Sequence, residues 1–441
     1  MKADSQKINI FWFRRDLRLN DNCGLFYALT SANPVLPVFI FDTCILDNLE
    51  DKKDRRVEFI HNALEEIHDE LTKLGSSLLV LHGKPLEAFK QITEQFSIEV
   101  VFTNHDYEPD AIKRDKEIKD FLSPKGIGFN TYKDQVIFEK KEIVKDNGSP
   151  YTVYTPYSKK WKAKLTREDC KAHKSEKYSG SFLKVKAFKV PALDETGFLK
   201  TGALFPPKKL RRAIIKKYES TRNYPAIFGT SRLSVHLRFG TVSIRELVGE
   251  ALKLNQTWLD ELIWREFFMM ILHNFPYVVN NPFNPAYENI LWRNNENEFK
   301  AWYEGKTGYP IVDAGMRELN ETGFMHNRVR MITASFLTKH LLIDWRWGET
   351  YFASKLLDYE LSSNNGNWQW AAGTGCDAAP YFRVFNPEIQ TKKFDPELKY
   401  IKKWVPEFDS PEYPIPVVEH ASARNRAIET YKKALDRYRK K

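Results

Sequence analysis

The 441-residue sequence contains four cysteines, and none of them belongs to a CxxC pair or stands near a histidine at metal-ligand spacing. Structural disulfides and a metal site are therefore not expected. The N-terminus carries no apolar signal-like segment, and no apolar run is long enough to cross a bilayer. We therefore expect a cytoplasmic protein with no membrane partner.

Several nucleotide-binding and catalytic signatures are also missing. No GxGxxG follows the first predicted strand and no GxxxxGK[ST] occurs, so neither a dinucleotide site nor a P-loop is indicated. No nucleophile triad or paired-carboxylate motif is evident, which leaves hydrolysis and acyl transfer without candidate residues. Redox chemistry on a bound organic cofactor fits the remaining residues better.

Positive charge and tryptophan are both concentrated away from the N-terminal region. Residues 1–130 hold 17 Lys and Arg against 22 Asp and Glu, whereas residues 131–441 hold 51 against 36. Nine of the eleven tryptophans lie between Trp258 and Trp404. A basic, aromatic-rich surface is typical of nucleic-acid binding, although Lys-rich surfaces also serve solubility alone.

The length exceeds what one hydrophobic core accommodates, so we expect more than one domain. Short apolar runs alternate with amphipathic stretches in the N-terminal region, which predicts an α/β domain with a doubly wound parallel sheet. The expected strands are 8–13, 35–41, 77–82, 99–104 and a segment near 128–137, and the clearest helix is 56–74.

The rest of the chain divides into a linker and a helical region. Residues 139–205 are rich in Lys and Ser, which predicts a long connection over the surface rather than a packed element. Helical periodicity prevails from residue 206 onward and predicts an all-α C-terminal domain. The expected helices are 233–254, 258–273, 311–319, 326–343 and a basic amphipathic helix or tail at the C-terminus.

The predicted helix 258–273 carries an unusual face. An acid, an arginine and two tryptophans share it, and buried charges of this kind need partners. A salt-bridged helix that simply packs on another helix is the alternative. The residues of this face are Trp258, Glu261, Trp264, Arg265 and Phe268.

Two further segments carry groups that could bind a specific guest. Asn327, Arg330 and Met331 project together from the predicted helix 326–343, although a polar core network would also explain them. Hydroxyl side chains cluster with an arginine at a predicted helix start, where they could bind a diphosphate or merely cap the helix. That cluster comprises Thr230, Ser231, Arg232 and Ser234.

The segment 358–387 is the most informative part of the sequence. Trp368 and Trp370 stand one residue apart, after an Asn-Asn-Gly-Asn run and before a series of small residues. Small residues and amides leave room for a large flat guest and supply hydrogen-bonding groups to orient it. The segment therefore predicts a buried aromatic cofactor site beside a base-binding surface.

Long stretches of the sequence resemble the photolyase/cryptochrome flavoproteins, closest to the class I cyclobutane pyrimidine dimer photolyases. The resemblance covers nearly the whole chain and implies an antenna-chromophore domain over 1–138, a linker over 139–205, and a helical FAD- and DNA-binding domain over 206–441. The stretches are FWFRRDLRLNDN (11–22), GTSRLS (229–234), ELIWREFF (261–268), GYPIVDAGMRELNETGFMHNRVRMITASFL (308–337) and NNGNWQWAAGTGCDAAPYFRVFNP (364–387).

By position, the resemblance implies a set of FAD contacts. Asn364 would face flavin N5, where a neutral amide favours the reduced FADH⁻ form of a repair enzyme. A second antenna chromophore would be a folate, a deazaflavin, another flavin or none. The implied FAD contacts are Tyr218, Thr230, Ser231, Arg232, Leu233 and Ser234 for the diphosphate and ribityl region, and Asn327, Arg330, Asp358, Tyr359, Glu360 and Asn364 around the flavin.

The resemblance also implies residues for catalysis and for DNA binding. Enzymes for six-four photoproducts carry a proton-donating His at the positions of Asn327 and Met331, so Asn and Met favour cyclobutane dimers. The implied electron-transfer chain is Trp368, Trp345 and Trp292; the lesion pocket is Glu261, Trp264, Met331 and Trp370; the DNA-backbone contacts are Arg222, Arg265 and Gln390. The implied catalytic set is Glu261, Asn364, Trp368, Trp345, Trp292, Met331 and Asn327.

The activity that the resemblance implies is light-driven repair of pyrimidine dimers in DNA by a monomeric carbon–carbon lyase. Excited FADH⁻ would pass an electron to a flipped-out dimer, because the flavin cannot reach a lesion stacked in the duplex. The enzyme would be cytoplasmic, and associated with the nucleoid if bacterial. A cryptochrome photoreceptor without repair activity, or a non-enzymatic flavoprotein that binds DNA, are the alternatives.

Overall fold

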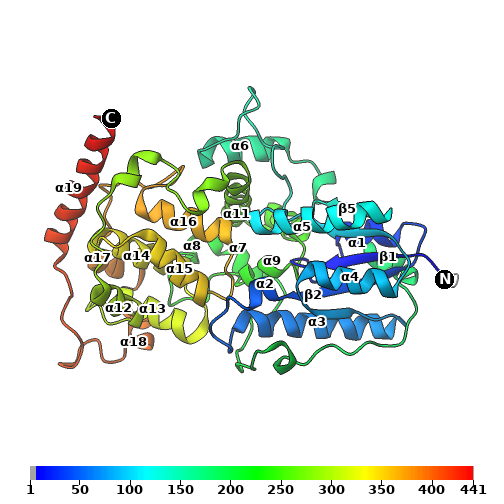
Figure 1. Ribbon diagram of the computed structural model, residues 1–441. Coiled ribbons are helices and arrows are strands. Elements are labelled where there is room, and N and C mark those ends of the chain that lie inside the picture. Colours follow the sequence, from blue (N-terminus) through cyan, green and yellow to red (C-terminus); the bar gives the residue numbers. More distant parts are fainter. Residues whose placement is uncertain (1–5, 441) are drawn as a thin grey trace. The chain divides into compact units, whose positions relative to one another are not determined.

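The computed structural model describes residues 6–440, which form two compact units (Figure 1). The first unit takes in the described residues up to Glu139 together with Lys164–Leu210 and Arg232–Lys253. The second takes in Lys140–Ala163, Arg211–Ser231 and the described residues from Leu254 onward. Within residues 6–440, no helix is long and apolar enough to cross a membrane.

The first unit is built on a five-stranded sheet in the order β3-β2-β1-β4-β5, with every neighbouring pair parallel. The strand order reverses direction at β1, as it does in doubly wound folds. The predicted fold class of this region is therefore confirmed. The strands are β1 (Ile8–Phe13), β2 (Val35–Asp42), β3 (Leu79–Gly83), β4 (Ile98–Asn104) and β5 (Gly128–Tyr132).

Both faces of the sheet are buried. Ile10 and Trp12 of β1 share one apolar cluster with Phe89 of α4 (Pro85–Gln95) and Leu122 of α5 (Pro109–Leu122). The alternate β1 residue Phe11 points to the opposite face, where it contacts α1 (Cys23–Leu29) beneath Gly24. Burial on both faces explains why the strands appear in the sequence as continuous apolar runs. The unit also contains α2 (Thr43–Leu46) and α3 (Arg55–Lys73).

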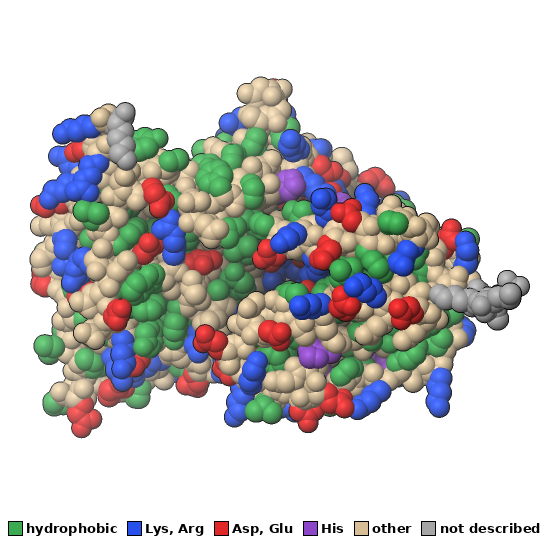
Figure 2. All heavy atoms as spheres, viewed as in Figure 1, with side chains coloured by type: hydrophobic (Ala, Val, Ile, Leu, Met, Phe, Trp, Pro, Cys, Tyr) green, Lys and Arg blue, Asp and Glu red, His purple; other side chains and the backbone are tan. Residues whose placement is uncertain are grey.

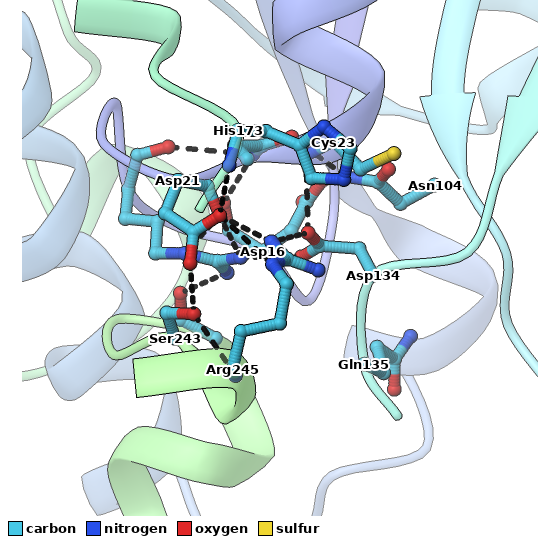
Figure 3. Close-up of polar contacts among 12 residues, drawn as sticks. Asp16, Asp21, Cys23, Asn104, Asp134, Gln135, His173, Ser243 and Arg245 are labelled. Atoms are coloured by element: carbon cyan, nitrogen blue, oxygen red, sulfur yellow. Dashed lines mark hydrogen bonds and ion pairs between the residues drawn. The ribbon is translucent and has the colours of Figure 1, made fainter. Parts of the chain in front are cut away.

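A buried ion-pair network joins α10 (Ile244–Leu254) to the sheet domain (Figure 3). Arg245 donates from Nε to Asp21 Oδ1 and from Nη2 to Asp134 Oδ1, both over 2.8 Å. Burial alone would raise the pKa of Asp134, but the guanidinium groups of Arg18 and Arg245 lower it below its ordinary value. Ser243 also donates to Asp21. The charges are thus paired, which a buried site requires.

The predicted helix 233–254 is two helices, α9 (Ser234–Phe239) and α10, separated at Gly240. Gly240 has a φ of +65°, and a Cβ there would lie 2.2 Å from the carbonyl oxygen of Arg15. Only glycine therefore fits where the chain passes Arg15. The prediction of one continuous helix was therefore wrong. Apolar periodicity carries no information about a single close contact between two backbone segments.

The predicted surface linker 139–205 contains a packed helix, α6 (Tyr154–Lys164). Tyr157 and Trp161 lie one turn apart and are each 1 % exposed. The Trp161 indole donates to Glu266 of α11 (Gln256–Asn274). The prediction that this segment has no packed element was therefore wrong. Lysines stand between the two aromatic residues, so the sequence shows no clear apolar face. Short 3₁₀ turns follow at Glu168–Cys170, Ser175–Ser181 and Asp194–Thr196.

The second unit is helical throughout the part that the structure describes, as predicted. Its core contains Trp302, Phe336, Trp345 and Trp368, each at most 2 % exposed. Besides α6 and α11, its helices are α7 (Arg212–Lys216), α8 (Tyr218–Thr221), α12 (Glu296–Glu304), α13 (Pro310–Thr322), α14 (Asn327–Ser335), α15 (Trp345–Lys355), α16 (Leu361–Ala372), α17 (Pro387–Phe394), α18 (Lys399–Trp404) and α19 (His420–Arg439), with 3₁₀ turns at Pro276–Val279 and Pro285–Asn289.

One predicted helix ends differently in the structure, and the C-terminal segment forms the helix that was one of its two predicted states. The predicted helix 326–343 ends as an α-helix at Ser335 and continues as a wide π-helical turn over Phe336–His340. Leu342 then takes a φ of +51°, which stops any helix. The C-terminal basic segment is a helix, α19, whose basic side chains gather on the face shown in Figure 2.

We expect Gly240→Ala to lower the free energy of unfolding by about 2–4 kcal/mol, because it adds left-handed backbone strain and overlap with Arg15. Gly249→Ala is the matched control, since it lies within α10 with no atom within 4 Å of its added Cβ. That control should gain about 0.5–1 kcal/mol from helix propensity. Thermal unfolding followed by circular dichroism measures both, and equal midpoints would contradict the expectation.

Candidate functional site

Helix α16 is the centre of the site, and a close approach to α11 fixes its position. A Cβ on Gly366 would lie 2.2 Å from the ring of Phe268 on α11, so the helices touch where α16 has no side chain. Gln369 anchors the same helix to the segment that follows α11, donating to Val278 O over 3.0 Å and accepting from the Phe283 N–H over 2.8 Å. Part of the amide-rich sequence is therefore structural.

A cavity of about 90 Å³ opens beside α16 in the second unit. Helix α14, the segment before α16, and α16 itself contribute most of its wall. The predicted residues among its lining are Asn327, Arg330, Met331, Asp358, Tyr359, Glu360, Asn364, Trp368 and Trp370. Sequence segments more than thirty residues apart thus meet at one cavity, as the motifs had indicated.

The orientation of the Asn364 amide follows from its partners. Its Nδ2 donates to the backbone oxygen and to Oε1 of Glu349, each over 3.1 Å. Both partners are acceptors, so the nitrogen must face them and the amide oxygen remains to accept a hydrogen bond. Burial raises the pKa of Glu349. Glu349 was not predicted, because an acid fifteen residues before the motif gives no sequence signal of its own.

A paired arginine forms another part of the wall. Arg330 Nη2 lies 3.0 Å from Asp358 Oδ2, and Arg330 Nε donates to Met325 O over 2.7 Å. Asn327 is exposed and Met331 is half-buried, with the amide nitrogen 4.0 Å from the sulfur. The pair Arg330–Asp358 is therefore fixed, and Asn327 and Met331 line the same cavity.

A second ion pair joins α11 to the start of α16. Arg265 Nη2 lies 3.5 Å from Oε1 of Glu360, which is 6 % exposed. Ser363 Oγ donates to the other carboxylate oxygen of Glu360 over 3.0 Å. The charge of Arg265 is thus neutralised by the N-cap residue of α16. The face of α11 that the sequence singled out is where this pairing occurs.

Glu261 lies among a different set of partners. It forms an ion pair with Arg222, whose guanidinium carbon is 5.6 Å from the ring centre of Tyr218. Burial raises the pKa of Glu261, and Arg222 acts against that shift. The sequence placed Tyr218 at the diphosphate, Arg222 at the DNA backbone and Glu261 at the lesion. The structure brings all three together beside α11.

The two tryptophans predicted for the lesion pocket are on different helices. Trp370 lines the cavity from α16, and Trp264 is half-buried on α11. One face of Trp264 is stacked on Tyr154, with ring centres 3.6 Å apart and an angle of 6° between the planes. Tyr154 was not predicted as part of any site, because it fell inside the presumed linker.

The three tryptophans predicted for electron transfer differ in burial. Trp368 and Trp345 are 2 % and 1 % exposed, and Trp292 is half-buried at the edge of the same core. Trp292 meets Tyr431 of α19 edge-on, with ring centres 6.0 Å apart. Trp368 meets Trp302, with ring centres 6.1 Å apart. The sequence analysis did not single out Trp302, because a tryptophan in an amphipathic helix is usually a core residue.

The remaining predicted residues lie outside the cavity lining. Thr230 and Ser231 are half-buried and belong to the second unit, whereas the three residues after them belong to the first. Of these, Arg232 and Ser234 are exposed and Leu233 is 1 % exposed. Gln390 is half-buried on α17. Their proposed contacts with a diphosphate or with DNA stay predictions.

Comparison with known proteins places these features in a family. Residues 9–176 match the family described as DNA photolyase, and residues 258–412 match the FAD binding domain of DNA photolyase. FAD is thus the cofactor that the helical unit binds. A deoxyribodipyrimidine photo-lyase of Synechococcus sp. is 38 % identical over 426 residues, covering 90 % of this chain and 87 % of its own.

Two solved structures extend the likeness to the fold. The archaeal photolyase from Sulfolobus tokodaii, whose crystal structure holds two FAD molecules, has a TM-score of 0.82 at 37 % identity, over 96 % of this chain and 99 % of its own. The Synechocystis sp. PCC6803 cryptochrome has a TM-score of 0.83 at 26 % identity, over 98 % and 100 %. The chain therefore belongs to the photolyase/cryptochrome family of FAD-binding proteins.

Proposed function

We propose that the protein is a light-driven deoxyribodipyrimidine photo-lyase that repairs cyclobutane pyrimidine dimers. The observation that carries the proposal is the wall of the α16 cavity, where Asn327 and Met331 stand with Asn364 and Trp370. Among the described residues that line this cavity, none is a histidine that could donate a proton to a six-four lesion. The wall instead offers amide and thioether groups, which suit a reaction that needs no proton transfer.

The cavity residues fit the flavin. The free oxygen of Asn364 can accept from a ring N–H, and the Arg330–Asp358 pair supplies charge that is already balanced. Asn327, Tyr359 and Glu360 complete the wall. Bound and fully reduced, FAD supplies the electron that light drives into the dimer. The side chains orient the ring, exclude water and leave the neutral amide at its edge.

The lesion is held by aromatic faces and one acid. Trp264 and Trp370 offer surfaces for a flipped-out dimer, and Glu261 can hydrogen-bond its base edges. Arg222, Arg265 and Gln390 contact the backbone phosphates, whose charge supplies most of the non-specific affinity. Trp368, Trp345 and Trp292 carry electrons from the surface to the flavin. The protein acts as a cytoplasmic monomer on DNA, and near the nucleoid if it is bacterial.

A cryptochrome photoreceptor without repair activity is the second candidate function. The likeness to the Synechocystis cryptochrome favours it as a candidate, because that fold matches this chain over nearly its full length. For either function, the second chromophore would be a folate, a deazaflavin, another flavin or none. The two FAD molecules of the Sulfolobus tokodaii photolyase support a flavin as the antenna.

A repair assay tests the function directly. The FAD-loaded, reduced protein is mixed with an oligonucleotide that contains a cyclobutane thymine dimer, and restored thymine is measured in darkness and under blue light. We expect loss of dimer only under light. No light-dependent repair would favour the photoreceptor, and repair confined to six-four lesions would overturn the substrate assignment.

Glu261→Ala should lower repair by about 10-fold or more, because removing a hydrogen bond from a charged group costs roughly 1.5–3 kcal/mol. Flavin content should not change, since Glu261 lies outside the cavity lining. Asp260→Ala is the matched control, because its carboxylate pairs with Lys162 instead. Flavin absorbance and repair rate are measured for both variants. Loss of flavin from Glu261→Ala would contradict its place in the lesion pocket.

Trp292→Phe should slow the light-driven reduction of oxidised bound flavin by at least 10-fold, without changing repair by pre-reduced protein. Phenylalanine is much harder to oxidise than tryptophan, so an electron carrier is removed while the packing remains. Trp347→Phe is the comparison, since Trp347 packs on Phe299, which in turn stacks on Trp302. Absorbance under illumination measures both. Slowing by Trp347→Phe instead would show that electrons enter through the Trp302 branch.

A further inference from the structure

Among the ring neighbours of Trp264, Tyr154 lies closest and most nearly parallel. The two ring centres are 3.6 Å apart with an angle of 6° between the planes. The other neighbours of the indole are Phe268, at 5.5 Å and 30°, and Phe267, which meets it edge-on at 5.6 Å. Trp264 is thus enclosed on one face by Tyr154 and supported on α11 by two phenylalanines, while it stays half-buried.

Tyr154 is itself held from two directions. Its hydroxyl donates to the backbone oxygen of Asp260 on α11 over 2.9 Å. Its backbone N–H donates to Oδ2 of Asp377 over 3.0 Å, in the loop that follows α16. One residue at the start of α6 therefore contacts both the helix that carries Trp264 and the loop that follows the helix carrying Trp370.

The stack is not needed to attach α6. Tyr157 and Trp161, each 1 % exposed, already bury the apolar face of this helix, and Trp161 donates to Glu266. Tyr154 lies one turn before them and is only half-buried. Its contacts go instead to α11, which carries Trp264, and to the loop that follows α16.

We propose that Tyr154 is a positioning residue that holds the Trp264 ring in the plane needed to stack on a flipped-out pyrimidine dimer. The inference rests on the proposed lesion pocket and adds to it a residue from α6. An indole that is free to change rotamer must lose that freedom when DNA binds, whereas a ring already stacked on Tyr154 has lost it beforehand. The stacked Tyr154 ring therefore favours binding of the lesion, although Tyr154 does not contact the lesion itself.

The experiment measures dissociation constants of the FAD-loaded protein in darkness, for a dimer-containing oligonucleotide and its undamaged twin. Tyr154→Ala should weaken binding of the damaged strand by roughly 3- to 10-fold, the range expected for losing an aromatic pair. Binding of the undamaged strand should stay unchanged. Tyr154→Phe should restore the preference, because it keeps the ring and loses only the hydroxyl.

Two comparisons separate positioning from general damage to the fold. Tyr151→Ala removes a ring from the same segment that contacts Tyr157 rather than Trp264, and should leave the preference for damaged DNA intact. Trp264→Ala should abolish the effect of Tyr154→Ala, so that the double variant binds as the Trp264→Ala single variant does.

Additive losses in the double variant would overturn the proposal, as would equal weakening for damaged and undamaged DNA. A loss in Tyr154→Phe as large as that in Tyr154→Ala would assign the effect to the hydroxyl and overturn it too. A wild-type protein that does not distinguish the two strands would overturn the proposed function itself, and the role of Tyr154 with it. Because this comparison uses only the wild-type protein, failure of the proposed function can be told apart from failure of the role of Tyr154.

Discussion

The contact between α11 and α16 is the constraint on which the site depends. Gly366 brings the backbone of α16 against the ring of Phe268, at a distance that no larger residue allows. The two helices carry several of the predicted site residues: Glu261, Trp264 and Arg265 on α11, and Asn364, Trp368 and Trp370 on α16. The Arg265–Glu360 pair then fixes where α16 begins. The cavity is lined from α14, from the segment before α16 and from α16 itself, so it depends on where α16 is held.

Within each unit, paired charges join separate segments at buried positions. An unpaired charge there would lower the free energy of unfolding. Arg245 with Asp21 and Asp134 forms such a pairing in the first unit, and Arg330 with Asp358 forms one at the cavity of the second. Each arginine is matched by carboxylates in hydrogen-bonding geometry, which offsets the loss of solvation on burial. The same arrangement leaves the cavity with balanced charge, so that its neutral amides and aromatic rings face the guest. Arginine–carboxylate pairs therefore stabilise the fold of the first unit and also balance the charge of the cavity in the second.

Sequence patterns predicted the elements well where one period ran unbroken. The parallel sheet was recognisable from its apolar runs, and α3, α11 and α13 from their apolar spacing. The patterns failed at Gly240, in α6 and after Ser335, where a single tertiary contact or a mixed composition decided the backbone. Among site residues, the cavity lining around Asn364 could be foreseen from motifs. The neighbours of predicted residues could not be foreseen, because each contact is made across the fold: Glu349 with Asn364, Trp302 with Trp368, and Tyr154 with Trp264.

The sequence by itself determined the two kinds of domain, the family to which the chain belongs and the amino acids available for its chemistry. Periodicity and long motifs are local properties, and they survive without knowledge of how the chain folds. Tertiary structure decided which groups are partners: Asn364 with Glu349, Glu261 with Arg222, and Trp264 with Tyr154. These pairs join residues that lie between 15 and 110 positions apart in the chain. Orientation and pairing depend on packing in three dimensions, which no spacing along the sequence records.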